Sequence, residues 1–195
     1  MSYKKTLIAI TISFCTVWIL FMGCVKDELI TKEITITTSS NDALKLFLEG
    51  RDLSDKLKSP QAAVMFDKAI ALDKDFAMAY LYRASSGGDY KIVRENLTKA
   101  VELLNRVTDG EKHLILYNKA LFDGDAVNQK QELDSLLLLF PEDKRVQDLA
   151  GIYYYTLQDY TNALIHFNKA VSIDNKYASS YNMLGYVHMG MQNFS

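Results

Sequence analysis

Three histidines and two cysteines are the side chains of this chain best suited to nucleophilic or metal chemistry. His113, His166 and His188 do not have the spacing of four residues that places two metal ligands on one helix face. Cys15 lies within an apolar N-terminal run, Cys24 follows that run, and no nucleophile–base pair is apparent. These patterns predict a protein that is not an enzyme and has no catalytic residue, metal site or cofactor.

Two glycine-containing stretches resemble ligand loops only in part. Asp123-Gly124-Asp125 begins like a calcium loop, but Val127 replaces an oxygen ligand and no glutamate stands at the twelfth position. Gly87-Gly88 lacks the preceding strand and the lysine of a phosphate-binding loop. Both stretches are therefore expected to be turns.

Composition places the chain among ordinary globular proteins. It has 195 residues, of which 49% are hydrophobic and 24% are charged, close to the averages for soluble domains. This length is enough for one domain. The formal net charge is −2 and no basic patch recurs on one face, so a nucleic-acid partner is not expected.

The stretch 144–177 has the pattern of two helices that pack on each other. Ala163, Phe167 and Ala170 have the spacing of a second helix, whose small residues admit its neighbours and whose ring fills the space between the helices. Gly151 marks the matching close approach on the first helix. The pattern starts again 34 residues after the stretch begins.

This stretch resembles a tetratricopeptide repeat, a helix–turn–helix unit with the same period. The resemblance implies an all-α fold, a right-handed α-solenoid of antiparallel helix pairs. In this register the repeat domain covers residues 42–195, with approximate repeats at 43–76, 77–109, 110–143, 144–177 and, in part, 178–195. Each pair leaves one apolar face uncovered, so a repeat becomes stable only by stacking on its neighbours.

The fifth repeat is expected to be truncated. Counted from Ala178, Phe194 takes the position of Tyr160 in the fourth repeat, and the counterparts of later residues are absent. A last helix over residues 177–190 would expose its outer apolar side, which carries Leu184, Val187 and Met191. We expect this uncapped helix to self-associate or to fray, and the natural gene product to continue through a completed repeat and a cap.

Residues 1–23 have the features of a secretory signal peptide. Lys4 and Lys5 precede an apolar run, 6–22, which is short for a membrane span of about 20 apolar residues. Gly23-Cys24 then resembles the bacterial lipobox, in which the cysteine is acylated and becomes N-terminal, and this implies a lipid anchor on Cys24. An uncleaved anchor helix with an incidental cysteine stays open as the alternative.

Residues 24–41 are expected to form a Thr/Ser-rich tether. Lys26-Asp27-Glu28 resembles the surface-export signal of some two-membrane bacteria, and an ordinary solvated tether is equally open. Ile34-Thr35-Ile36-Thr37-Thr38 alternates like a strand but has no obvious partner strand, so an extended linker is expected. These features predict a lipid-anchored protein of the bacterial cell envelope, in the outer membrane, with surface exposure left open.

The repeat resemblance implies a concave groove, formed by the first helices of the pairs, that binds a protein or peptide partner. By register the expected groove residues are Leu44, Phe47, Arg51, Leu114, Asn118, Leu121, Asp148, Ile152, Tyr155, Asn182, Tyr186 and Met189. Two alternatives are an accessory lipoprotein for nutrient or glycan capture and the sensor portion of a longer signalling protein. A pocket closed on three sides would favour a small ligand, and an open groove would favour a protein.

Overall fold

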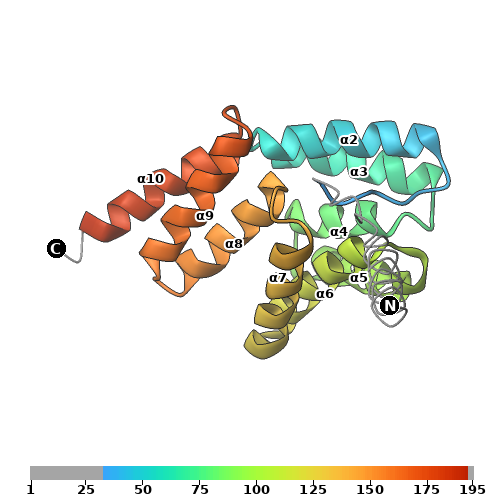
Figure 1. The fold of residues 1–195 in the computed structure, drawn as a ribbon. Coiled ribbons are helices and arrows are strands. Elements are labelled where there is room, and N and C mark those ends of the chain that lie inside the picture. Colours follow the sequence, from blue (N-terminus) through green and yellow to red (C-terminus); the bar gives the residue numbers. More distant parts are fainter. Residues whose placement is uncertain (1–32, 193–195) are drawn as a thin grey trace, which may run out of the picture. The chain divides into compact units, whose positions relative to one another are not determined.

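The structure, a computed structural model, describes residues 33–192. These residues form nine α-helices, one short 3-10 turn and no strand (Figure 1). The helices are α2 (Asn41–Asp55), α3 (Ser59–Leu72), α4 (Ala77–Ser85), α5 (Tyr90–Glu102), α6 (Asp109–Asp123), α7 (Ala126–Leu139), α8 (Lys144–Thr156), α9 (Tyr160–Ile173) and α10 (Ala178–Gln192). The 3-10 turn, Leu104–Arg106, follows α5. The expected all-α class is confirmed.

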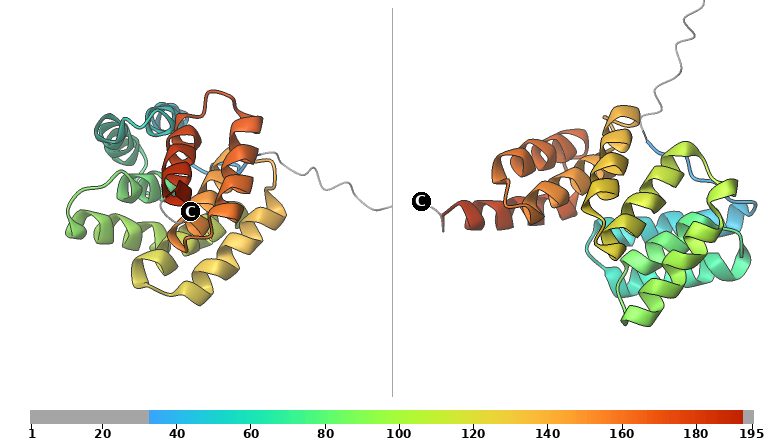
Figure 2. Two further views of the ribbon diagram at one scale, coloured as in Figure 1. Left: turned by 90° about the vertical axis from the view of Figure 1, so that its left-hand side faces the viewer. Right: turned by 90° about the horizontal axis from the view of Figure 1, so that it is seen from below.

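Neighbouring helices form antiparallel pairs. Helix α2 packs on α3, α4 on α5, α6 on α7 and α8 on α9, while α10 packs on both α9 and α8. Figure 2 shows these pairs following one another in the order of the chain. Residues 33–192 therefore adopt a tetratricopeptide-like α-solenoid fold, as the repeat pattern predicted.

Side-chain caps fix where several helices begin. Thr108 and Glu111 form a capping box at the start of α6, in which each side chain accepts a hydrogen bond from the other residue's backbone N–H. Asp89 and Asp125 each accept a backbone N–H in the first turn of α5 and α7. The two stretches that resembled ligand loops lie in front of these last two helices, where they serve as helix connections.

The close approach of paired helices depends on two glycines. A Cβ placed on Gly151 of α8 would lie 2.5 Å from ring atoms of Phe167 on α9. A Cβ on Gly50 of α2 would lie 2.7 Å from the ring of Phe66 on α3. Both distances are too short for two carbon atoms, so a larger residue would push the helices apart. The packing role predicted for Gly151 and Phe167 is confirmed.

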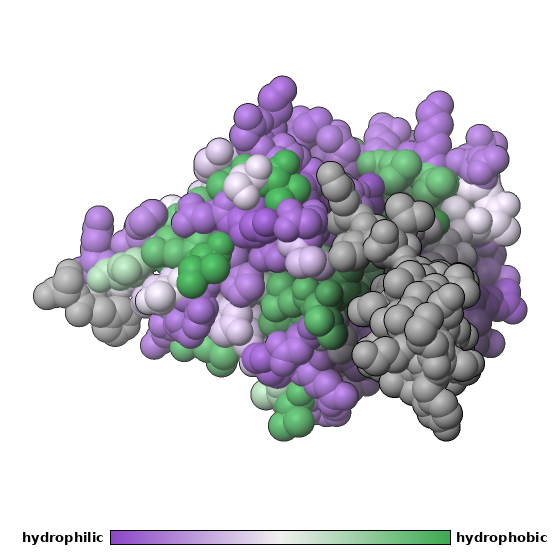
Figure 3. Space-filling view, in the orientation of Figure 1, coloured by the Kyte–Doolittle hydropathy of each residue, from purple (hydrophilic) through white to green (hydrophobic). Residues whose placement is uncertain are grey.

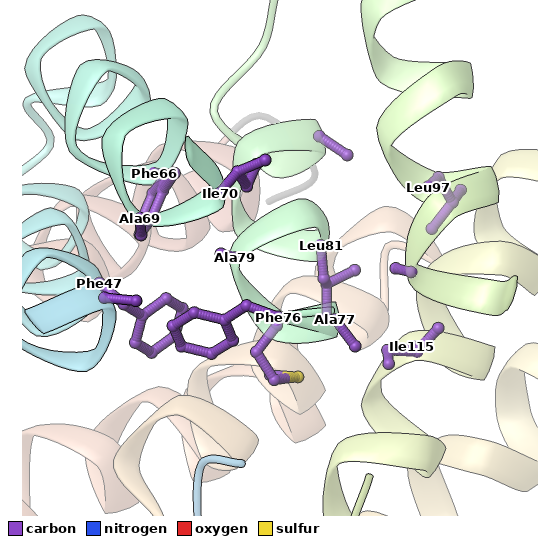
Figure 4. Packing of buried hydrophobic residues seen from close by; sticks show 14 of the residues in the cluster. Phe47, Phe66, Ala69, Ile70, Phe76, Ala77, Ala79, Leu81, Leu97 and Ile115 are labelled. Atoms are coloured by element: carbon purple, nitrogen blue, oxygen red, sulfur yellow. The ribbon is translucent and has the colours of Figure 1, made fainter. Parts of the chain in front are cut away.

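The largest hydrophobic core joins three successive helix pairs. Figure 4 shows α4 in its middle, with Phe47 of α2 on one side and with Leu97 of α5 and Ile115 of α6 on the other. All three side chains are buried. Because each pair covers the open face of its neighbour, the core continues from one pair to the next.

Helix α10 packs against the fourth pair through one face. Val187 is fully buried beside Ala163 and Phe167, so the expectation that Val187 is exposed is wrong. Leu184 contacts the same cluster, because it lies three residues before Val187 on the same helix face. Met191 is exposed as expected. Self-association and fraying of this helix stay predictions.

Apolar side chains also lie on the outside of the solenoid. Figure 3 shows hydrophobic surface over α7. On this helix Val127 and Leu138 are 78% and 81% exposed. Among the helices of residues 33–192, none combines the length and the apolar character needed to cross a membrane.

Candidate functional site

A cavity of about 280 Å³ lies between the first helices of the pairs. Helices α2, α4, α6 and α8 all contribute to its wall. Its apolar lining includes Ile34, Ile36, Met78, Leu81, Leu114 and Val146. Its polar lining includes Arg51, Asp55, Asn118, Arg145, Asp148 and Tyr177. The cavity can therefore contact both aliphatic groups and charged or hydroxyl groups of a ligand.

Ion pairs between the first and the fourth helix pair lie at the wall of the cavity. Arg145 at the start of α8 donates a hydrogen bond to Asp55 at the end of α2, with 2.5 Å between Nη2 and Oδ2. Lys144 Nζ lies 3.9 Å from the same carboxylate and also contacts Asp174. The side chains of Asp55, Lys144 and Arg145 are only 16%, 15% and 17% exposed, so water screens this contact weakly.

Burial and neighbouring groups set the protonation around the cavity. Burial alone would lower the pKa of Arg145, but Tyr82 and Asp55 raise it, and this pKa lies above its ordinary value. Burial raises the pKa of Asp148, against the hydrogen bonds from Ser180 at 2.5 Å and Ser179 at 2.8 Å. Arg145 therefore stays a cation, whereas Asp148 binds a proton more readily than an ordinary aspartate. Arg145 Nε is buried and has no hydrogen-bond partner within residues 33–192.

Residues 33–40, which we call the strap, are extended and docked on the solenoid. The sequence predicted an extended tether here, and the conformation agrees, but these residues are not a free linker. Three backbone N–H groups of the strap donate to solenoid carboxylates, in the pairs Ile34–Asp143 at 3.0 Å, Thr37–Glu111 at 2.7 Å and Ser39–Asp73 at 2.9 Å. Through Ile34 and Ile36 the strap also forms part of the cavity wall.

The three acceptors, Asp73, Glu111 and Asp143, form what we call the carboxylate rim. Each stands where one helix pair gives way to the next: Asp73 follows α3, Glu111 lies in the first turn of α6, and Asp143 caps the start of α8. All three are buried, and none forms an ion pair with a basic side chain of residues 33–192. Hydrogen bonds from backbone and hydroxyl groups, many of them in the strap, stabilise their charges instead.

Asp73 makes the strap contact sensitive to pH. Burial acts to raise the pKa of this carboxyl, but hydrogen bonds from Thr38, Ser39 and Asp75 outweigh it, and the pKa lies below its ordinary value of 3.8. A carboxyl with a lower pKa in the folded state stabilises the fold above its unfolded pKa. That contribution is lost as the pH falls through the folded pKa.

We therefore expect the free energy of unfolding to fall as the pH drops below about 4, and Asp73→Asn to weaken this dependence. At pH 7 the substitution should cost roughly 1–3 kcal/mol, because a charged acceptor of several hydrogen bonds is lost. Urea titrations at pH 7 and pH 3 measure both effects, with Glu49→Gln on the exposed face of α2 as control. An unchanged pH dependence in Asp73→Asn would contradict the assignment.

The cavity brings together four of the predicted groove residues, namely Arg51, Leu114, Asn118 and Asp148. Phe47 is fully buried, so its assignment to a groove surface is wrong. The centroid of its ring lies 5.0 Å from that of Phe76 and 5.1 Å from that of Tyr82. This aromatic packing places Phe47 in the core between α2 and α4.

The remaining predicted groove residues lie outside the cavity. Leu44 is half-buried against the large core, and Ile152 and Tyr155 pack in the cluster that α10 completes. The exposed members of the set are Leu121, Asn182, Tyr186 and Met189. The register places all of them on first helices, but the contact between the first and fourth pairs decides which ones reach the cavity.

The histidines lie apart from one another and from the cavity lining. His113 Nδ1 lies 2.6 Å from a carboxylate oxygen of Glu132. His166 stacks on Tyr154 with ring centroids 5.3 Å apart, and burial lowers the pKa of this histidine. Within residues 33–192 no group of three or more histidine, cysteine, aspartate or glutamate residues could hold a metal ion. Cys24, the predicted lipidation site, lies outside the described residues.

Sequence reasoning missed the strap, the carboxylate rim and the cross-contact of Arg145. The alternation of isoleucine and threonine from Ile34 to Thr37 was a usable signal of a half-buried extended segment. The segment has no partner strand, and side-chain carboxylates of the solenoid supply the acceptors that a strand would otherwise supply. The bond from Arg145 to Asp55 joins residues 90 positions apart, which no local pattern reveals.

Comparison with known proteins shows a likeness to solved structures. No family model matches the chain, and no curated protein matches it. A chain in the crystal structure of the APC/C hetero-tetramer Cut9-Hcn1 is similar over 77% of this chain, with 21% identity and a TM-score of 0.48. The match spans 34% of that longer chain. The assignment of the fold rests on the helix pairs described above.

Proposed function

We propose that this chain is a non-enzymatic lipoprotein of a bacterial cell envelope that binds a protein or peptide partner through its solenoid. The observation that carries this proposal is the cavity between the first helices of four pairs, with apolar and charged walls side by side. Solenoids of helix pairs present continuous inner surfaces that commonly bind other proteins. The fold alone does not identify the partner, because the same architecture serves many functions.

The proposed lipid anchor is supported by the sequence of the first 24 residues. Lys4 and Lys5, the apolar run behind them, and Gly23-Cys24 follow the order of a lipoprotein signal. Several acyl chains on Cys24 would hold the protein at a membrane, because each buried CH₂ group contributes about 0.8 kcal/mol. We place the protein at the outer membrane, with surface exposure as a further possibility.

Cys24→Ser is expected to abolish acyl labelling and to release the protein from the membrane fraction. Cys15→Ser is the matched control, because Cys15 lies within the apolar run and should leave with the signal. Metabolic labelling with a fatty-acid analogue, followed by fractionation, measures both variants. Labelling that persists in Cys24→Ser would rule out the anchor.

Surface exposure is tested separately by replacing Lys26, Asp27 and Glu28 with alanine. We expect lower protease accessibility on whole cells with acylation unchanged. If protease accessibility does not change, these three residues are part of an ordinary tether and not an export signal.

Partner binding is tested by photo-crosslinking in intact cells. A photoreactive residue at Asn118, which lines the cavity, should give a discrete adduct that a photoreactive residue at Lys68 on exposed α3 does not give. Identical adducts at the two positions, or none at Asn118, would count against a partner at the cavity.

The small volume of the cavity favours a second candidate, capture of a small nutrient or glycan ligand. The volume of about 280 Å³ is close to the lower limit for ligand pockets, and Arg145 and Asp55 form an ion pair in the cavity wall. Under this alternative a small saccharide or amino acid should raise the melting temperature of the wild type, and Asp148→Ala should abolish that rise. No rise with any member of a broad ligand panel would favour the protein partner.

A further inference from the structure

Three of the contacts that hold the strap recognise an extended backbone. The bonds from Ile34, Thr37 and Ser39 to the carboxylate rim start from backbone N–H groups. Every residue except proline has such a group, so these bonds do not depend on the side chains of the strap. The rim can hold another extended segment in the same way.

One side chain of the strap is deeply buried and gives the contact its selectivity. Ile34 is 8% exposed and packs in the core cluster of α6, α7 and α8. A Cβ placed on Gly110 would lie 3.2 Å from Ile34 Cγ2, so the glycine leaves room for a branched aliphatic group. Thr35 and Thr37 are exposed. The site under the strap therefore selects one aliphatic side chain at position 34 and tolerates variation at position 35, whereas the hydroxyl of Thr37 also donates a hydrogen bond to Glu111.

The strap donates hydrogen bonds to the carboxylate rim but brings no positive charge to it, and its one charged side chain, Glu33, pairs with Arg51 and Arg145. No basic side chain of residues 33–192 pairs with Asp73, Glu111 or Asp143, and residues 33–40 contain no lysine or arginine. Thr38 Oγ1 donates a hydrogen bond to Asp73 at 2.6 Å, so the side chain at position 38 lies next to a carboxylate. A lysine there would bring a positive charge to this carboxylate and form an ion pair in place of a hydrogen bond from a neutral donor.

We propose that the carboxylate rim and the apolar site of Ile34 form a peptide-binding track, which the strap occupies in cis. The partner of the solenoid is an extended, basic segment of another protein that replaces the strap at the carboxylate rim. This inference rests on the proposed protein-binding function and names the kind of partner. The strap competes at an effective concentration on the order of millimolar, because it is joined directly to α2. Displacement of the strap would also remove Ile34 and Ile36 from the cavity wall and open the cavity.

The test uses the full chain and fluorescent decapeptides with the sequence of residues 31–40, in which Thr38 is replaced by lysine. Ile34→Asp in the protein should loosen the strap, because it places a carboxylate in an apolar site beside Asp143. Thr35→Asp adds the same charge at an exposed neighbour and is the matched control. We expect the decapeptide to bind the Ile34→Asp protein at least tenfold more tightly than it binds wild type or Thr35→Asp.

Proline substitutions in the decapeptide test the contact with Glu111. Thr37→Pro removes both the N–H and the hydroxyl that donate to Glu111, whereas Thr35→Pro removes an N–H that donates to no rim carboxylate. Binding should fall at least tenfold for the first peptide and change little for the second. Equal affinity of the two proline peptides, or of the three proteins, would overturn the proposal.

Hydrogen exchange on the wild-type chain keeps the proposal testable if Ile34→Asp does not fold. A displaceable strap opens locally, so the amides of Ile34, Thr37 and Ser39 should exchange at least tenfold faster than that of Tyr117 in the core of α6. Equal rates would show that the strap opens only with global unfolding and would refute its role as an exchangeable ligand. If the decapeptide binds but no adduct forms at Asn118 in cells, the peptide-binding track is supported and the proposed function is rejected.

Discussion

Replacing Phe167 with alanine is expected to lower the free energy of unfolding by about 3–5 kcal/mol. The ring is fully buried between α8 and α9 and rests against the backbone at Gly151. The rest of the solenoid holds these helices apart, so they cannot close the space that the ring leaves. The substitution therefore loses the transfer free energy of the ring and also creates a cavity, which costs further stability.

Urea denaturation of the purified chain measures this effect, and Ile165→Ala is the control on the same helix. Ile165 is 58% exposed, so its truncation should change the free energy of unfolding by less than about 0.5 kcal/mol. A loss below about 1 kcal/mol for Phe167→Ala would be incompatible with a ring that fills the space within the pair.

Glu111→Ala is expected to cost about 3 kcal/mol or more, although it removes no hydrophobic contact. The carboxylate is fully buried and accepts hydrogen bonds from the N–H and hydroxyl groups of both Thr37 and Thr108, at 2.7–3.0 Å. Alanine leaves these donors without their acceptor, and buried donors without partners are costly. It also breaks the capping box of α6.

The comparison variant for Glu111→Ala is Asp125→Ala, which removes the N-cap of α7 at the solvent-facing end of the same pair. A cap of this kind is worth about 1 kcal/mol. Chemical denaturation should therefore show a clearly larger loss for Glu111→Ala. Equal losses would mean that the contact with the strap contributes nothing beyond the helix cap.

The helix pairs could be predicted from the sequence because their determinants are local. The small residues Ala163 and Ala170 and the ring of Phe167 recur at fixed spacings, and each spacing corresponds to one helix face. The burial of Val187 was not predicted, since periodicity gives the faces of a helix but not which face meets its neighbour.

The candidate site depended on contacts that periodicity does not encode. The register placed Phe47 and Arg51 on one face of α2, yet one side chain is in the core and the other lines the cavity. The two side chains differ because α8 approaches the C-terminal end of α2, where Arg145 binds Asp55. Such contacts depend on how far each pair rotates relative to the previous one, and this rotation accumulates over several repeats.

The strap has a consequence for how the chain reaches its native state during synthesis. Ile34 bonds to Asp143, a separation of 109 residues, and Thr37 to Glu111, a separation of 74. A ribosome that adds about 5–20 residues per second needs roughly 5–20 s to produce the second partner of the longer contact. The early pairs can form by nearest-neighbour contacts in that interval, but the strap, which is synthesised first, cannot dock fully until Glu111 and Asp143 have been added. Once it has docked, it links repeats that are not neighbours, so the solenoid should unfold more cooperatively than a chain of independently stacked units.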